Sequence, residues 1–210
     1  SKTMTLKLLG SSSGHTALDA PASAGSNTLV LPPNNGTTGQ VLQTDGNGNL
    51  TWITPNSPAF FAYWNANTTQ TISNTTNTAA SWLTSEMFDT DSAYDTSNQR
   101  FTVPAGKGGK YVINAGCNLY SNGNSLRSAI IRIKLNGSGT WAASQYSLIM
   151  NNDENRVRHA QINLNTMLNL AAGDYIELVV YGEVLNNTLY ISNDASGVKS
   201  NFLSGYKLMV

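Results

Sequence analysis

Alternation of apolar and polar residues is the clearest pattern in the longer, C-terminal part of the chain. In residues 109–120 the apolar side chains fall on every second position, opposite Asn114 and Asn118. Residues 159–170 repeat the pattern, with Gln161 among the polar positions. Successive side chains of a β-strand point to opposite faces, so each stretch predicts a half-buried strand. The apolar faces are Tyr111, Ile113, Ala115, Cys117 and Leu119, and Ile162, Leu164, Leu168 and Leu170, the latter opposite Gln161, Asn163, Asn165 and Asn169.

Further short apolar stretches, separated by turn residues, follow one another from Phe60 onward, and none has the 3.6-residue period of an amphipathic helix. Examples are FFAYW, RFTV, SAIIRIKL, DYIELVVYG and TLYIS. Short strands at this spacing predict an all-β domain, an antiparallel sandwich or jelly roll, over residues 58–210.

Residues 1–57 have a different composition, rich in Gly, Ser, Asn, Thr and Pro, with the short apolar islands TLKLL, NTLVL, QVLQT and NLTWI. The stretch VLQTDGNGNLTW predicts a β-hairpin, because each residue of DGNG tolerates the positive φ of a tight turn. One chain has too few apolar residues here to offset the ordering entropy. The segment is therefore either a flexible tail or, as we expect, a β-rich stalk ordered by other copies. Pro55 and Pro58 predict the boundary.

Charge and cysteine content exclude several classes of partner and of stabilising site. Charged residues make up 11% of the chain and the formal net charge is zero, which disfavours nucleic-acid or anionic membrane partners. A single cysteine allows no intrachain disulfide, and no apolar run reaches the length of about 18 residues that a membrane span needs. The chain also lacks a signal-peptide pattern, so we expect synthesis in a cytoplasm.

Candidate catalytic and metal-binding residues are sparse. The two histidines, His15 and His159, have no recognisable triad partners, and Cys117 falls on an apolar face, where a buried structural thiol is expected. We therefore predict no enzyme. A few carboxylates leave a polysaccharide depolymerase as an alternative: Asp89, Asp91, Asp95, Asp153, Glu154, Asp174 and Glu177.

Calcium is the one cofactor that the sequence raises. Asp89, Asp91 and Asp95 fall at the first, third and seventh positions of a calcium-loop pattern. The pattern then fails, because Tyr94 replaces the sixth-position glycine and Arg100 the final glutamate. The segment is expected to be a solvated turn, with these three carboxylates as weak calcium candidates.

Polar loops on a rigid sandwich are where binding residues usually lie. The loops SNGNSLR, NGSGT and NNDENR supply such tips, and Trp141 follows the second of them. Trp141 either fills the core or lies on the surface, where its ring would contact a ligand. The receptor-binding candidates are Trp141, Asn122, Asn124, Asn152 and Asp153.

Residues 59–210 resemble the C1q-like globular domain, which is related to the tumour-necrosis-factor jelly roll. The likeness rests first on the stretch MFDTDSAYDTSNQRFTVPAGKGGKYVI, where an aromatic residue, an acidic turn and a second aromatic residue are followed by F-T-x-P and G-x-Y. It rests also on a Gly-Asp turn and on the closing strand FLSGYKL. The resemblance implies a sandwich that assembles as a trimer, and some C1q-like heads bind calcium. The family-motif core positions are Phe88, Tyr94, Phe101, Pro104, Gly109, Tyr111, Gly173, Phe202, Gly205 and Tyr206.

The N-terminal segment resembles a stretch of bacteriophage tail and head fibres, in which x-L-x-A-P and T-L-x-L-P precede G-Q-V-L-x-T-D-G-x-G-x-L-x-W. Here the segment is GHTALDAPASAGSNTLVLPPNNGTTGQVLQTDGNGNLTW, and it lacks collagen-type repeats. The resemblance implies a three-chain stalk on a virion surface, joined to other virion proteins. Both halves thus imply three-fold symmetry.

These observations lead to a first hypothesis of a noncatalytic virion fibre or spike. Its trimeric knob would bind a host surface glycan or protein during adsorption. The alternative is a head-decorating or assembly fibre, whose knob only trimerises and stabilises the stalk.

Overall fold

The computed structural model describes residues 5–148, 157–193 and 199–209. Its contacts divide the chain into two compact units, residues 1–55 and residues 56–210. Among the described residues every regular element is a β-strand, so no helix in this part of the chain could cross a membrane. The all-β prediction is confirmed.

The N-terminal unit contains two separate strand pairs. Strand β1 (Leu6–Leu9) pairs with β2 (His15–Leu18), and β3 (Val41–Thr44) pairs with β4 (Leu50–Ile53). The second pair is the predicted hairpin. The Asp45 carboxylate accepts hydrogen bonds from the backbone N–H of Asn47 at 2.8 Å and of Asn49 at 3.1 Å, while Gly46 and Gly48 have φ of 81° and 96°. Turn chemistry therefore fixes this hairpin locally.

A preceding segment folds back onto the hairpin. Val30 forms a parallel bridge beside β4, where the Leu50 N–H donates to the Val30 carbonyl at 2.8 Å. The Trp52 indole N–H donates to the Asn34 carbonyl at 2.8 Å, and its ring covers Gly36. The apolar island at residues 27–31 contributes only this bridge, because the chain turns away at residues 32–36.

The N-terminal unit leaves its apolar side chains in solvent. Every residue of β1, β2 and β3 is exposed, and Leu9 has 82% of its surface accessible. An isolated pair of four-residue strands is at best marginally stable in water. A single copy of this unit thus lacks a hydrophobic core of its own.

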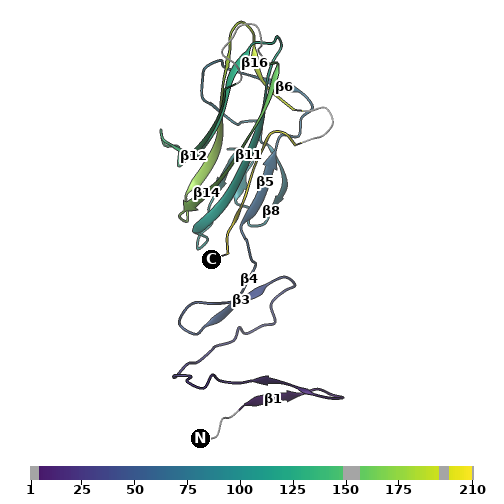
Figure 1. Ribbon diagram of the computed structural model, residues 1–210, viewed down its shortest axis with the longest axis vertical. Helices are drawn as coiled ribbons and strands as arrows, with labels where there is room; N and C mark the ends of the chain where they lie inside the picture. Colours follow the sequence, from purple (N-terminus) through teal and green to yellow (C-terminus); the bar gives the residue numbers. More distant parts are fainter. Residues whose placement is uncertain (1–4, 149–156, 194–198, 210) are drawn as a thin grey trace. The chain divides into compact units, whose positions relative to one another are not determined.

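The C-terminal unit consists of two antiparallel sheets, visible in Figure 1 as long curved strands. In the described residues, the seven-stranded sheet has the order β6-β16-β11-β17-β5-β8, with β14 on the other side of β11. Its strands are β5 (Ala59–Tyr63), β6 (Thr69–Ile72), β8 (Ser85–Asp89), β11 (Gly109–Ser121), β14 (His159–Leu170), β16 (Leu189–Ser192) and β17 (Phe202–Lys207).

The six-stranded sheet has the order β13-β12-β15-β10-β9, with β7 also paired to β15. Its strands are β7 (Thr78–Ala79), β9 (Tyr94–Asp95), β10 (Arg100–Thr102), β12 (Leu126–Leu135), β13 (Trp141–Leu148) and β15 (Tyr175–Val184). The pairings connect strands distant in the sequence, such as β11 with β17 and β12 with β15.

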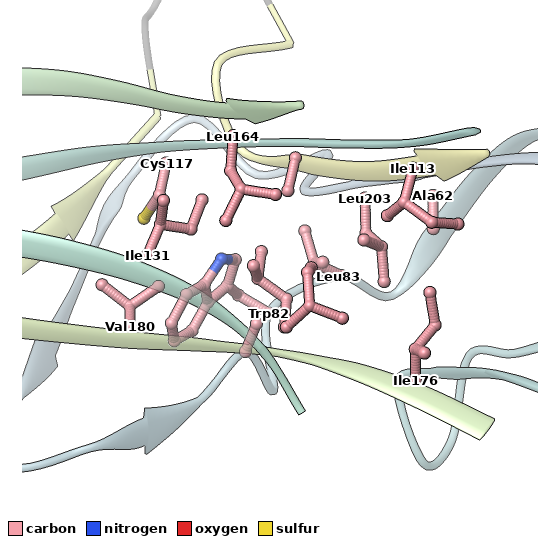
Figure 2. Packing of buried hydrophobic residues seen from close by; sticks show 14 of the residues in the cluster. Ala62, Trp82, Leu83, Ile113, Cys117, Ile131, Leu164, Ile176, Val180 and Leu203 are labelled. Carbon is pink, nitrogen blue, oxygen red and sulfur yellow. The ribbon is translucent and has the colours of Figure 1, made fainter. Parts of the chain in front are cut away.

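The core lies between the two sheets. Figure 2 shows Ile113, Cys117 and Leu203 of one sheet facing Ile131 and Val180 of the other. The alternation predicted for β11 is confirmed, since Tyr111, Ile113, Ala115, Cys117 and Leu119 are all buried. The β14 pattern is confirmed as well, with its amide side chains exposed on the opposite face. Burial raises the pKa of the Cys117 thiol, as expected for a structural cysteine.

Candidate functional sites

The outer face of the seven-stranded sheet carries exposed and half-buried aromatic rings, which we call the aromatic face: Phe61, Tyr63, Phe88, Phe202 and Tyr206. In β5 these positions alternate with the buried Phe60 and Ala62. Phe61 stacks on Phe202 at 5.4 Å between ring centroids and lies 6.3 Å from Phe88. Phe88 and Tyr206 remain 46% and 38% exposed. Such a cluster is typical of an association surface.

The aromatic face is hollowed near its centre. A depression of about 280 Å³ is lined by residues that include Phe61, Phe88, Asn114, Ser204 and Tyr206. Next to it, the amides of β14 form a polar band, in which Asn165 lies opposite Asn114. The sheet therefore presents an apolar half and an amide half, with few charges to desolvate.

The predicted receptor residues do not converge on one site. The chain enters this unit near Ser57, whose hydroxyl lies 3.4 Å from the Lys107 ammonium, and we call this the entry end. The turn before Trp141 is at the same end. Its Asn136 side chain donates to the Asp174 carboxylate at 2.7 Å, and the backbone carbonyl of Asp174 accepts from the N–H of Val103, which shortly precedes Lys107. Trp141 was expected near a binding tip, but it lies close to the entry end of the sandwich.

The loop residues Asn122 and Asn124 are exposed at the far end, where β11 finishes and β12 begins. The backbone of Ser125 in this loop accepts from Leu185, and Gly123 lies against Asn187. The candidates Asn152 and Asp153 lie outside the described residues. Trp141 and the Asn122 loop are therefore two separate surfaces.

Comparison with known proteins identifies the fold of the C-terminal unit. No protein-family model matches the chain, and no curated protein matches it. Among solved structures, the globular domain of zebrafish complement 1qA protein has 13% identity and a TM-score of 0.48, covering 73% of this chain and 98% of that chain. The Eiger TNF structure from S. frugiperda has 11% identity and a TM-score of 0.50, covering 72% of this chain and 92% of that one.

A match over 72% of the chain lies mainly in the C-terminal unit, and at such low identity it establishes the fold alone. The C-terminal unit has a TNF-like jelly-roll fold. The predicted antiparallel jelly-roll sandwich is confirmed.

The family-motif positions divide between the interior and the surface of this jelly roll. Tyr94, Phe101 and Tyr111 are buried. The Tyr111 hydroxyl donates to the Lys107 carbonyl at 2.6 Å, and burial together with the Asp91 charge raises the pKa of Tyr111 to about 12. Pro104 and Gly109 are half-buried, and Gly173 is exposed with φ of 89° at a turn.

Three aromatic motif positions are corrections to a purely core assignment. Phe88 and Tyr206 are exposed and Phe202 is half-buried, because β8 and β17 direct these side chains to the outer face of the jelly roll. The alternation along β17 carried a sequence signal for this arrangement. Leu203 and Tyr206 are an odd number of residues apart, so their side chains point to opposite faces, and of the two only Leu203 is buried.

Gly205 is a motif position where any side chain would meet packed atoms. A Cβ there would lie 2.7 Å from Ile113 Cδ1 and 2.8 Å from the Val112 carbonyl oxygen. We expect Gly205→Ala to lower the free energy of unfolding by about 1–3 kcal/mol, measured by urea titration. Gly139→Ala is the control, because a Cβ at Gly139 has open space. Equal stability of the two variants would contradict this account of Gly205.

The three weak calcium candidates bind separate partners. Asp89 accepts from the Tyr94 N–H at 2.7 Å, and Asp95 accepts from the Ser97 N–H at 2.8 Å. Asp91 accepts from the Ser57 hydroxyl at 2.6 Å. Within the described residues no group of three or more acidic, histidine or cysteine side chains converges as a metal site would require. The structure therefore does not bring Asp89, Asp91 and Asp95 together.

Asp91 instead ties the entry segment to the jelly roll, and its contacts depend on pH. Partial burial acts to raise its pKa, but hydrogen bonds from Ser57 and Thr90 and the charge of Lys107 outweigh this and lower it. A lowered folded-state pKa gives stability that is present above the ordinary value of about 4 and is lost as the pH falls through the folded value.

We expect Asp91→Asn to reduce the unfolding free energy at pH 7 by about 1–3 kcal/mol, since charged hydrogen bonds are lost. The difference from the unmodified protein should shrink as the pH falls below about 4. Thermal unfolding between pH 3 and pH 7 measures it, with the exposed Asp19→Asn as control. A difference that is constant with pH would exclude a role for the Asp91 charge.

Proposed function

We propose that this chain is a noncatalytic virion fibre or spike protein, whose jelly-roll knob forms a trimer and binds the surface of a bacterial host. The observation that carries the proposal is that both units leave large apolar side chains exposed in a single copy. In the N-terminal unit these include Leu6, Leu8 and Leu9, and in the jelly roll they include Phe88 and Tyr206.

Further copies of the same chain are the best occupants for these surfaces. The N-terminal unit cannot bury its leucines by itself, and its fibre-like sequence implies intertwined chains. Three-fold symmetry requires a heterologous contact, in which one patch of each copy meets a different patch of the next. The aromatic face and the neighbouring amide band are two such patches; their side chains are uncharged, and the Lys199 ammonium lies 4.8 Å from the Tyr63 ring centroid.

Trimerisation would also make host binding effective. Three knobs on one stalk bind multivalently, so contacts that are weak individually add up to useful avidity. The stalk would join other virion proteins, and the knob would lie on the particle surface. An assembly or head-decorating fibre remains the competing proposal, because the exposed apolar surfaces account for assembly without a receptor.

Two measurements test the proposal. Light scattering of the full chain should give three times 22.5 kDa and remain constant on dilution. The fluorescently labelled full chain should adsorb to host bacteria and compete with phage adsorption. A monomer would contradict the trimeric fibre, whereas a stable trimer that adsorbs to no bacterium would favour the assembly role.

A further inference from the structure

The outer face of the six-stranded sheet carries a second organised surface, distinct from the aromatic face. Three neighbouring strands place nine side chains on it in three rows, as the strand register shows. The rows are Tyr146, Ile130 and Tyr181; Ser144, Arg132 and Val179; and Trp141, Lys134 and Glu177. We call these nine residues the Arg132 face. Sequence reasoning picked Trp141 but missed the others, although the alternation in IIRIKL places Arg132 and Lys134 on one side.

The guanidinium of Arg132, at the centre, lies over two aromatic rings. Its guanidinium carbon lies 4.8 Å from the Trp141 ring centroid and 5.5 Å from that of Tyr181. One guanidinium N–H donates to the Asn77 side-chain oxygen. The Arg132 Nε is buried without a hydrogen-bond partner among the described residues. Arg132 is therefore ordered before any ligand arrives, which lowers the entropic cost of binding.

The Arg132 charge is not neutralised within the described part of the chain. The ion pairs found there join Lys107 to Asp91 and Arg127 to Glu183. The Arg132 face contains two cationic side chains, Arg132 and Lys134, and one carboxylate, Glu177. The face is thus locally positive in a chain of zero net charge, so an anionic group is the complementary ligand.

Arg100 on the same sheet provides a contrast. It also stacks on a ring, at 4.6 Å from the Tyr175 centroid. However, its cross-strand neighbours are the carboxylates of Asp95 and Glu177. The Asp95 pKa is lowered by hydrogen bonds from Asn98 and Ser97 and in part by the charge of Arg100. Arg100 has carboxylates directly across from it on both neighbouring strands, whereas the residues directly across from Arg132 are Ser144 and Val179.

We propose that the Arg132 face binds a carboxylate-bearing polysaccharide, an inference that rests on the proposed host-binding function and names its ligand class. The guanidinium would bind the sugar carboxylate, because its planar fork matches that group. Trp141 and Tyr146, which are 36% and 53% exposed, would contact the apolar faces of the sugar rings. Ser144 and Asn77 supply neutral hydrogen-bonding groups beside the charge.

The geometry favours a polysaccharide over an acidic protein segment. Protein partners usually insert an anchor side chain into a desolvated pocket, but Ile130 and Val179 of this face are buried, and its exposed side chains, Trp141, Ser144 and Tyr146, lie along β13. Its rings flank the cation on an extended surface, which suits a linear polymer lying across the strands. The aromatic face is on the other sheet, so assembly and polysaccharide binding use separate surfaces.

The test is titration calorimetry of the full chain with polygalacturonate, with fully methyl-esterified polygalacturonate as the uncharged probe and poly-glutamate as the acidic polypeptide. We expect binding to polygalacturonate alone, weakened by salt. Arg132→Gln and Trp141→Ala should each weaken it at least 10-fold. Arg158→Gln is the control, because Arg158 also stacks on a ring, that of Tyr120, but on the other sheet, and it should leave the affinity unchanged. A solution mass and melting temperature equal to those of the unmodified protein show that a variant is folded. If Arg132→Gln does not fold, Trp141→Ala tests the site, because Trp141 is exposed.

Several results would overturn the proposal: no binding to polygalacturonate, equal binding of the methyl ester or poly-glutamate, or equal loss in Arg158→Gln. The bacterial adsorption assay separates this site from the broader function. If Arg132→Gln adsorbs like the unmodified chain, the Arg132 face is not the receptor site while host binding stands. If the unmodified chain adsorbs to no host, the proposed function fails.

Discussion

Replacing both Phe88 and Tyr206 with aspartate is expected to reduce the solution mass of the full chain from three copies to one. Both side chains point away from the core of their own chain, so the single jelly roll should still fold. Fully burying an exposed aromatic ring contributes about 1.5–3 kcal/mol. Phe88 and Tyr206 are 46% and 38% exposed in one copy, and a ring of three copies repeats the interface three times, so losing both aromatics costs the trimer about 4–8 kcal/mol before any charge repulsion is counted.

The matched control is Tyr146→Asp, which places the same charge on an exposed aromatic position of the other sheet. Light scattering after size exclusion should show this variant with the mass of the unmodified protein. If the double variant also keeps a trimeric mass, the aromatic face is not the assembly surface. In that case the N-terminal unit alone would have to account for any assembly.

The second large effect is expected in the core. Phe101 is fully buried and stacks on Phe60 with 4.4 Å between ring centroids and an interplanar angle of 8°. Its ring also lies 5.6 Å from that of Tyr111. We expect Phe101→Ala to lower the unfolding free energy by about 3–5 kcal/mol, through lost burial and the cavity left behind. This is a large share of the about 5–15 kcal/mol typical of a domain.

Urea unfolding, followed by tryptophan fluorescence, measures this loss. It should be repeated at several protein concentrations, because assembly makes the apparent stability depend on concentration. Phe101→Leu should cost less than Phe101→Ala, since it leaves a smaller cavity. The surface variant Tyr146→Ala should stay within about 0.5 kcal/mol of the unmodified protein. A Phe101→Ala loss no larger than that of Tyr146→Ala would contradict the assigned core.

The two proposed surfaces have different physical roles. The aromatic face is apolar and nearly uncharged, which suits a permanent contact between copies. The Arg132 face carries a preorganised cation between exposed rings, which suits a reversible contact with a charged polymer. Since they lie on opposite sheets, variants of one are internal controls for the other.

Local patterns accounted for much of the fold. The alternation in residues 109–120 and 159–170 placed their buried side chains correctly, because a strand's two-residue period is read directly from the sequence. The DGNG turn predicted the β3–β4 hairpin, since its glycines supply the positive φ and the Asp45 carboxylate accepts backbone hydrogen bonds within the turn. Short strands with little local patterning were missed, such as β2 and β7, because their pairing partners decide them.

Candidate sites were harder to predict. The register of β13, β12 and β15 brings together Trp141, Arg132 and Tyr181, of which Tyr181 is far from the other two along the chain. No regular spacing of residues in the sequence predicts such a cluster. The same long-range pairing separated Trp141 from the Asn122 loop and kept Asp89, Asp91 and Asp95 on separate partners.

The sequence by itself determined the all-β class, the strands with strong alternation and the hairpin turn, because side-chain parity and backbone φ are properties of neighbouring residues. The tertiary structure alone decided which aromatic residues fill the core and which face solvent, as with Phe101 and Phe88. It also decided that Arg132 has no ion-pair partner within the described residues. Both outcomes depend on the pairing of strands distant in sequence, where burial and electrostatic neutralisation are set by the neighbours across the sheet.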